Sequence, residues 1–171
     1  MVVISIPQLI KLSFPVENIK MADFFNEHFR DFIQALNNKK VEYVLVGGMA
    51  VVLHGYVRGT GDMDIWVNKT KINYQHLVKS FHEFGMPVFD MSEEKFMGNE
   101  FDVWGFGVSP VKIEIMTAVK GLQFDETFQM AQFYDDNGLQ VRFVHINHLI
   151  EAKKASGRHK DMDDIEQLTR K

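Results

Sequence analysis

Cysteine is absent from this sequence of 171 residues, which excludes disulfides, thiolate zinc sites and cysteine nucleophiles. A reducing compartment fits this absence, so we expect a cytoplasmic protein. Long hydrophobic runs are also missing: no stretch approaches the roughly 18 uninterrupted apolar residues of a membrane-spanning helix, and no membrane partner is expected. An excess of basic charge is missing as well, because 23 acidic residues outnumber 19 lysines and arginines and the net charge is -4. That balance argues against broad, sequence-independent nucleic-acid binding but is compatible with a local basic patch.

The motifs of several common enzyme classes are missing too. The sequence contains no phosphate-loop Gly-Lys-Ser/Thr motif, and Gly105-Phe106-Gly107 lacks the third glycine and the strand-turn-helix context of a dinucleotide site. His145 and His148 lack the spacing and the additional ligands of a zinc site. No nucleophile-elbow motif supports a hydrolase triad. The chemistry of this chain must therefore come from other residues.

What the sequence does contain is typical of one globular domain. Its length fits a single domain, and its 46% apolar and 25% charged residues are normal proportions. Fifteen phenylalanines predict a core rich in aromatic side chains. Residues 1–22 lack the basic start, continuous apolar stretch and cleavage site of a signal peptide, so we expect an N-terminal arm or an extra strand there. Translation from Met21 is the alternative, and 23–171 are expected to form the single domain.

Helical and strand patterns alternate after residue 22, which predicts an α/β-type domain. Asp23 is expected to cap the first helix. The stretch 90–107 fits neither pattern clearly, and 135–138 is expected to be a turn. Strands are expected at 41–46, 62–67, 111–116 and 139–144, and helices at 23–40, 49–54, 70–84, 125–133, 146–156 and 162–170.

Gly47 and Gly48 follow the first expected strand and precede a short helix. Without side chains, they let a ligand approach the backbone closely. The helix after them presents free N–H groups and a positive dipole end, which suit phosphate. A plain tight turn is the alternative interpretation of the same two glycines.

Asp62 and Asp64 lie two residues apart in an otherwise apolar strand. Because side chains alternate along a strand, both carboxylates share one face with Trp66, and the intervening apolar residues point into the core. Adjacent like charges are unfavourable in a sheet without compensation. A divalent cation such as magnesium supplies it through hard oxygen ligands. A solvated strand end remains the alternative.

Glu114 places a third carboxylate among apolar neighbours in another expected strand, 111–116. If this strand lies beside the first, Glu114 meets Asp62 and Asp64. Three carboxylates and bound phosphates could then hold two cations about 4 Å apart, the arrangement used for in-line nucleotidyl transfer. The alternative is a surface residue on an edge strand.

These residues carry a family resemblance. Val46-Gly47-Gly48, thirteen intervening residues and then Asp62-Met63-Asp64-Ile65 resemble the signature of the polymerase-β-type nucleotidyltransferase superfamily. Ile113-Glu114-Ile115 is similar to the third-carboxylate element of that superfamily. Three longer segments resemble the bacterial branch that includes the AbiEii-like toxins: VEYVLVGGMAVVLHGYVRGTGDMDIWV, GVSPVKIEIMTAVKG and LIEAKKASGRHKDMDDIEQL.

The resemblance implies a mixed β-sheet flanked by helices, a magnesium-dependent reaction and a nucleoside triphosphate donor. Manganese is an alternative metal, and ATP is the expected triphosphate. By carry-over, Gly47 and Gly48 would hold the triphosphate, Asp62 and Asp64 would bind the metals, and Glu114 would complete the site and help to deprotonate the attacking hydroxyl. Many active members have Asp at the third position. The longer Glu moves its carboxylate by one C–C bond, where a tolerance of about 0.5 Å matters, so reduced or altered activity is an open alternative.

The partners implied are a triphosphate and an acceptor, and the sequence does not choose among tRNA, a protein or a small molecule. A large acceptor-binding domain is not expected in a chain of this length, so a partner is expected to hold the acceptor. A toxin-type enzyme with a cognate antitoxin and a non-catalytic nucleotide-binding or interaction module are the alternatives. A homo-oligomer also stays open.

Further candidates lie outside the carboxylate strands. Arg58 and Thr60 precede the Asp62 strand and are candidates for triphosphate binding, with a solvent-exposed loop as the alternative. Lys153 and Arg158 could reach nucleotide phosphates from the penultimate helix, or form a solvated face paired with nearby aspartates. His54 is expected to pack or hydrogen-bond at a helix end.

Two lysines and two aspartates near the C-terminus are expected to have structural roles rather than roles in binding or catalysis. Lys154 and Lys160 are expected to be solvated. Asp161 is expected to cap the last helix, with Asp164 in its first turn and favourably placed against the helix dipole.

Overall fold

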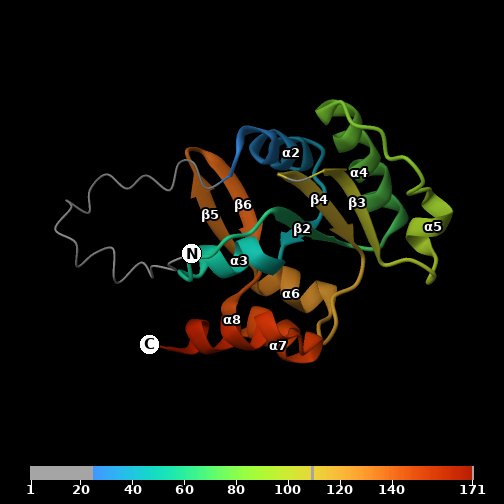
Figure 1. Ribbon diagram of the computed structural model, residues 1–171. Helices are drawn as coiled ribbons and strands as arrows, with labels where there is room; N and C mark the ends of the chain where they lie inside the picture. Colours follow the sequence, from blue (N-terminus) through green and yellow to red (C-terminus); the bar gives the residue numbers. More distant parts are fainter. Residues whose placement is uncertain (1–24, 109, 171) are drawn as a thin grey trace.

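The computed structural model describes residues 25–108 and 110–170, and its architecture is a six-stranded sheet between two layers of helices (Figure 1). The expected arm or strand at 1–22, Met21 and Asp23 lie outside the described residues. Within them, no helix is long and apolar enough to cross a membrane.

The sheet is mixed, with the strand order β3-β4-β2-β1-β6-β5. The pairs β2–β4 and β1–β6 are parallel, and the other three neighbouring pairs are antiparallel. This confirms the predicted α/β class and the mixed sheet flanked by helices. The strands are β1 Tyr43–Leu45, β2 Asp62–Val67, β3 Val103–Val108, β4 Val111–Met116, β5 Gln132–Asp136 and β6 Leu139–Phe143.

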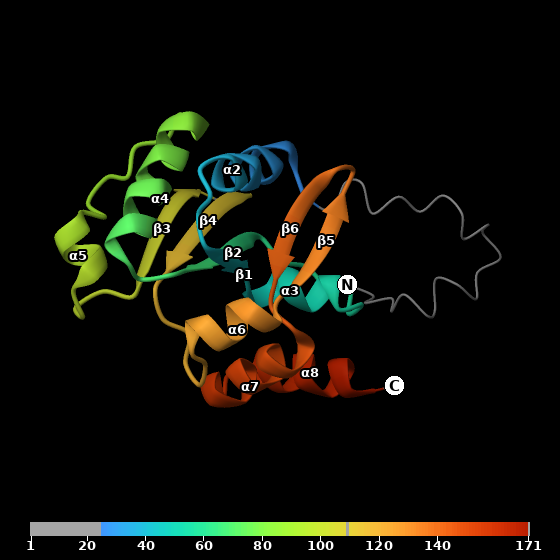
Figure 2. The same cartoon turned by 180° about the vertical axis from the view of Figure 1, so that it is seen from behind.

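Helices cover both faces of the sheet, as the two opposite views show (Figures 1 and 2). One layer contains α2, α4 and α5, and the other contains α3, α6, α7 and α8. The bounds are α2 Glu27–Asn38, α3 Gly47–Leu53, α4 Lys71–Phe84, α5 Glu93–Met97, α6 Phe124–Met130, α7 Ile146–Ser156 and α8 His159–Thr169.

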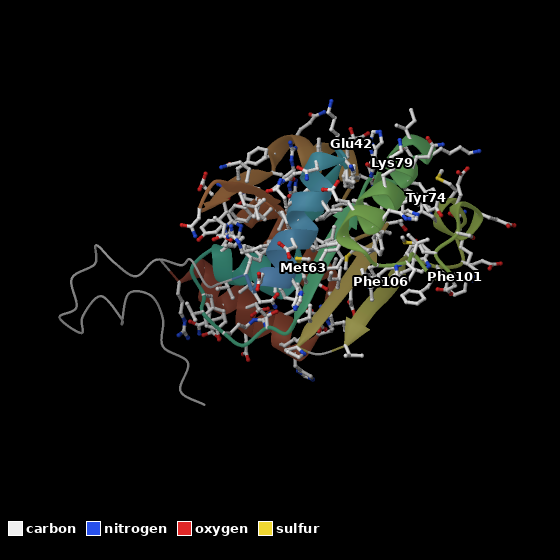
Figure 3. The ribbon with its side chains drawn as sticks, turned by 90° about the horizontal axis from the view of Figure 1, so that it is seen from above. Glu42, Met63, Tyr74, Lys79, Phe101 and Phe106 are labelled. Carbon is white, nitrogen blue, oxygen red and sulfur yellow. The ribbon has the colours of Figure 1, made fainter. Side chains whose placement is uncertain are left out.

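The structure has two hydrophobic clusters, one on each face of the sheet. Side chains of β2 alternate between them, as its sequence pattern predicts. Met63 and Ile65 are fully buried in the cluster beneath α2 and α4, which also contains Phe106 (Figure 3). Trp66 belongs to the other cluster, with side chains from α3, α7 and α8. Asp62 and Asp64 alternate with Met63 and Ile65 and therefore share the face of Trp66, as predicted.

The first helix differs from the expectation at its start. It begins at Glu27, because Asn26 is the N-cap and its side chain accepts a hydrogen bond from the N–H of Phe29 at 2.9 Å. Asn26, and not the predicted Asp23, is therefore the cap of this helix.

Two regions adopt structure that the local pattern did not reveal. The stretch 90–107 contains α5, capped by Ser92, and most of edge strand β3. The helix expected at 125–133 ends at Met130. Residues 132–136 form β5, so the first two residues of the turn expected at 135–138 belong to a strand. Non-local contacts hold β5 in place: it pairs with β6, and the guanidinium of Arg142 on β6 packs over the ring of Phe133 at 4.7 Å.

The last helix begins three residues before the predicted Met162, with Arg158 as N-cap residue. Asp161 is therefore inside the helix, and the prediction that it caps the helix is wrong. Asp164 follows one turn later and is buried. His54 is the C-cap residue of the short helix α3. Its Nε2 lies 2.8 Å from the carbonyl oxygen of Val144, as expected for a contact at a helix end.

Candidate active site

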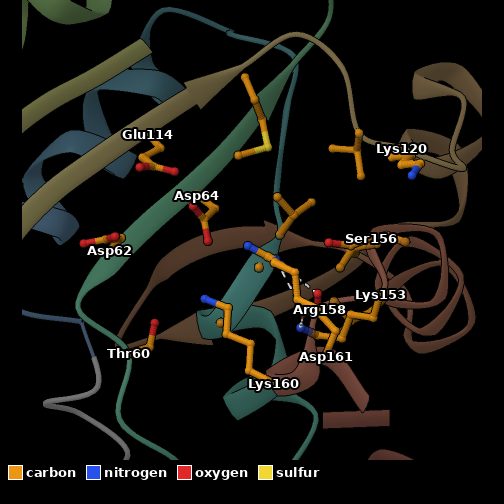
Figure 4. Close-up of a pocket in the computed structure, with 18 of the residues that line it drawn as sticks. Thr60, Asp62, Asp64, Glu114, Lys120, Lys153, Ser156, Arg158, Lys160 and Asp161 are labelled. Carbon is orange, nitrogen blue, oxygen red and sulfur yellow. Dashed lines mark hydrogen bonds and ion pairs between the residues drawn. The ribbon is translucent and has the colours of Figure 1, made fainter. Parts of the chain in front are cut away.

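A cavity of about 680 Å³ opens on the sheet face that carries Asp62 and Asp64 (Figure 4). The start of α3, the loop 58–61, strands β2 and β4, and helices α7 and α8 contribute to its wall. Segments far apart in sequence thus meet at one place. All nine site residues proposed from the sequence line this cavity: Gly47, Gly48, Arg58, Thr60, Asp62, Asp64, Glu114, Lys153 and Arg158.

The three carboxylates meet because β2 and β4 are parallel neighbours. Asp64 is directly opposite Glu114 in the register, and Asp62 is two residues before Asp64 on the same face. Burial, together with the negative charges of Glu114 and Asp62, raises the pKa of Asp64 to about 6, although a hydrogen bond from the N–H of Gly48 lowers it. The site therefore holds negative charge at an energetic cost.

Lys112 also reaches this group and was not singled out from the sequence. Its Nζ lies 2.5 Å from a carboxylate oxygen of Glu114 and 3.7 Å from one of Asp62. The hydrogen bond to Glu114 and the nearby negative charges raise the pKa of Lys112, so it is an ammonium. The signal was in the sequence, since Lys112 precedes Glu114 by two residues and must share its face.

The two glycines are surrounded closely by protein side chains. Gly47 has a φ of +64°, and a Cβ on it would lie 1.8 Å from Oδ2 of Asp64. A Cβ on Gly48 would lie 2.6 Å from the hydroxyl oxygen of Thr60 and 3.3 Å from the guanidinium of Arg58. The glycine pair thus allows the α3 turn to approach the carboxylate strand and the 58–61 loop.

A buried ion-pair network forms the opposite wall. Lys153, of which 5% is exposed, lies 3.0 Å from Asp161 and 2.6 Å from Asp164. Arg58 binds Asp164 at 2.7 Å. Arg158 binds Asp161 at 2.8 Å (Figure 4). Burial opposes the ionisation of Asp161, but the hydrogen bonds from Arg158 and Lys153 outweigh it and lower its pKa to about 2. The three cations outnumber the two aspartates, so this wall is positive.

Two further lysines add to the positive side of the cavity. Lys120 and Lys160 line it, and both are exposed. The side chain of Lys160 extends toward the cavity on the side of Thr60 (Figure 4). The sequence predicts that Lys160 is a solvated residue. It reaches the cavity because α8 begins earlier than predicted, which places Lys160 in the first turn.

An apolar wall completes the cavity between the charged sides. It suits a nucleobase or ribose, since ligand pockets combine apolar walls with a few placed polar groups. Its residues come from β4, the following loop and α7: Met116, Val119, Leu122, Leu149 and Ala152.

The donor chemistry of the carboxylates fits magnesium, which prefers oxygen ligands. Asp62, Asp64 and Glu114 would hold such an ion. In the part of the chain that the structure describes, however, no three carboxylate or imidazole side chains converge into a finished metal-ligand cluster. Glu114 contacts both the ammonium of Lys112 and the side chain of Asp64.

Known proteins resemble this chain in fold or in sequence. A crystal structure of a candidate nucleotidyltransferase from Thermotoga maritima matches with a TM-score of 0.56 and 18% identity, over 81% of this chain and 88% of that chain. An antigenic nucleotidyltransferase-like protein from Paracoccidioides brasiliensis matches with a TM-score of 0.49 and 16% identity, over 81% and 72% of the two chains. A comparison with curated protein sequences gave no match. A family model described as "Nucleotidyltransferase of unknown function (DUF6036)" matches residues 27–169. This chain therefore belongs to the DUF6036 family of nucleotidyltransferases.

Proposed function

We propose that this protein is a magnesium-dependent enzyme that transfers a nucleoside monophosphate from a nucleoside triphosphate to an acceptor and releases pyrophosphate. One observation carries the proposal: Asp62, Asp64 and Glu114 share one face of two paired strands, inside a cavity whose opposite wall is positive. Such a charge arrangement suits a cation-bound triphosphate. ATP is the first candidate donor.

Asp62, Asp64 and Glu114 would hold the cation, with Mn²⁺ as an alternative to Mg²⁺. When bound, the ion neutralises charge on the transferring phosphoryl group and the leaving pyrophosphate. Arg158 and Lys160 would contact the triphosphate from the positive wall, as would Lys120. Arg58 and Lys153 are engaged by buried aspartates and would act mainly by holding that wall in position.

The transfer step is an in-line displacement. The oxygen of an acceptor hydroxyl forms a bond to the α-phosphorus, and the bond from that phosphorus to the bridging oxygen breaks, so that pyrophosphate leaves. Glu114 would take the hydroxyl proton as general base. The acceptor is a tRNA, a protein hydroxyl or a small molecule, and a partner protein would help to hold it.

A toxin-type form of the same activity is the second candidate, favoured by the three sequence segments that resemble the AbiEii-like branch. The acceptor would then be a cellular target and an antitoxin would be the partner. Growth arrest on expression, abolished by Asp64→Ala, is the expected result. Unimpaired growth at high expression would contradict this form while leaving the transferase activity intact.

Calorimetric titration with ATP and magnesium tests the binding that the proposal requires. The wild-type protein should bind ATP in a magnesium-dependent manner, and Asp62→Asn should bind it at least about tenfold more weakly, a loss of 1.4 kcal/mol. Asp163→Asn is the matched control, because Asp163 is an exposed residue of α8 that does not line the cavity. A wild-type protein that binds neither metal nor any of the four triphosphates would contradict the proposal.

A further inference from the structure

Among the residues that the structure describes, Lys112 is the one cation that lies beside the proposed metal ligands rather than on the opposite wall. Its ammonium contacts two of the three carboxylates, Glu114 at 2.5 Å and Asp62 at 3.7 Å. These are the positions from which a divalent cation would draw its ligands. Lys112 and a metal ion would therefore compete for the same oxygen atoms.

The strand register places Lys112 beside the carboxylates. Lys112 is opposite Asp62 across the β2–β4 pair, and Glu114 is opposite Asp64. Residues that face each other in register, and residues two apart on one strand, lie on the same face. The four side chains form a compact group in which one positive charge faces three negative ones.

Lys112 shares the Glu114 carboxylate with Asp64. The Glu114 carboxylate is engaged by the ammonium, and no three-residue ligand cluster is found among the described residues. An ammonium satisfies carboxylates with hydrogen bonds at about 2.8 Å and without directional coordination. Magnesium requires oxygens at about 2.0–2.1 Å in near-octahedral geometry. The two cations thus stabilise different positions of the same side chains.

The structure also leaves Lys112 room to withdraw. Its stem crosses Gly105 of the edge strand β3, where a Cβ would lie 3.6 Å from Cε of Lys112. Because Gly105 carries no side chain, the stem is not confined on that side. The side chain of Lys112 is 36% exposed, so its ammonium can move into solvent at small cost.

We propose that Lys112 is a built-in counter-cation that occupies the carboxylate site in the absence of metal and competes with divalent cations for Asp62 and Glu114. This inference rests on the proposed function. It makes Lys112 a positioning residue that sets the metal affinity of the site. Binding of the metal and withdrawal of Lys112 are then coupled, so the free protein binds cations weakly and the metal arrives most readily together with a triphosphate.

Titration of the nucleotide-free protein with Mn²⁺, followed by calorimetry, tests this competition. Lys112→Met keeps an unbranched side chain and removes the ammonium. The variant should bind Mn²⁺ at least about tenfold more tightly than the wild type, which corresponds to 1.4 kcal/mol. Lys112→Arg, which retains the charge, should bind Mn²⁺ no more tightly than the wild type does.

Lys79→Met is the matched control, because Lys79 is an exposed lysine of α4 on the other face of the sheet (Figure 3). Its Mn²⁺ affinity should equal that of the wild type, so a general effect of net charge is excluded. Equal Mn²⁺ affinity in Lys112→Met and wild type would overturn this inference and leave the proposed function standing. Absence of Mn²⁺ binding in both proteins would overturn the inference and the metal-dependent function together. Thermal unfolding of each variant in EDTA verifies that the compared proteins are folded.

Discussion

Replacing Asp64 with asparagine removes one of the three carboxylates while keeping the shape of the side chain and an oxygen that can accept the hydrogen bond from Gly48. In the metal-free protein, burial and the neighbouring charges raise the pKa of Asp64 from 3.8 to about 6. Ionised Asp64 is therefore less stable in the folded state than in the unfolded state. We predict that Asp64→Asn makes the metal-free protein more stable at neutral and alkaline pH.

The magnitude follows from the pKa difference between the two states. The folded protein keeps the proton on Asp64 up to about pH 6, whereas the unfolded chain loses it near 3.8. The cost of ionisation is thus absent well below pH 3.8, grows as the pH rises to about 6 and is complete above it. A difference of about two pKa units corresponds to roughly 3 kcal/mol, which is the upper limit of the gain at pH 8, and the gain falls to roughly 1 kcal/mol at pH 4.5.

Urea unfolding in EDTA at pH 4.5 and pH 8 measures this gain for Asp64→Asn and for the wild type. Magnesium should reverse the order at pH 8, because an ion that binds only the folded wild type stabilises it. A variant that is equally stable or less stable than the wild type at pH 8 in EDTA would refute the reasoning that Asp64 is destabilised by its neighbours.

Four further outcomes are expected. Gly47→Ala should destabilise the fold by about 1–2 kcal/mol, because its φ is +64°, and should abolish metal-dependent ATP binding in calorimetry, because the new methyl displaces Asp64. Lys153→Met should lower the free energy of unfolding by roughly 3 kcal/mol in urea, since it leaves two buried aspartates with one arginine each. The pKa of Asp161, lowered to about 2, predicts that its contribution to stability is complete above about pH 4 and is lost as the pH falls toward 2, measurable by acid unfolding of wild type and Asp161→Asn. Lys160→Ala should weaken ATP binding in a salt-dependent manner and leave the unfolding free energy within about 0.5 kcal/mol of the wild type.

The arrangement of the carboxylates on β2 was predictable because it depends only on the alternation of residues within that strand. Alternation along β2 is enough to put Asp62 and Asp64 on one face and Met63 on the other. The pairing of β2 with β4 was a hypothesis from sequence, and the structure supplies the register that sets Glu114 opposite Asp64. Lys112 obeys the same alternation and could have been included by applying the rule to every residue of that strand.

Other features depended on partners that are distant in sequence. Asp161 looked like a helix cap from its neighbours alone, but Lys153 on α7 and Arg158 engage it inside the helix. Strand β3, with two glycines among its six residues, has weak strand propensity and is formed by pairing with β4. Strand β5 is extended because it pairs with β6. The helical pattern that precedes β5 along the chain gave no sign of this pairing.

Transfer of label from ATP shows directly whether this protein is a nucleotidyltransferase. ATP labelled at the α-phosphate and ATP labelled at the γ-phosphate are each incubated with magnesium, the protein and three acceptor pools: total RNA, lysate protein and a small-molecule extract. We expect covalent transfer of the α label alone, with release of pyrophosphate, and loss of this transfer in Asp64→Asn. Transfer of the γ label would contradict the account, as would the absence of α-label transfer to any pool with each of the four triphosphates.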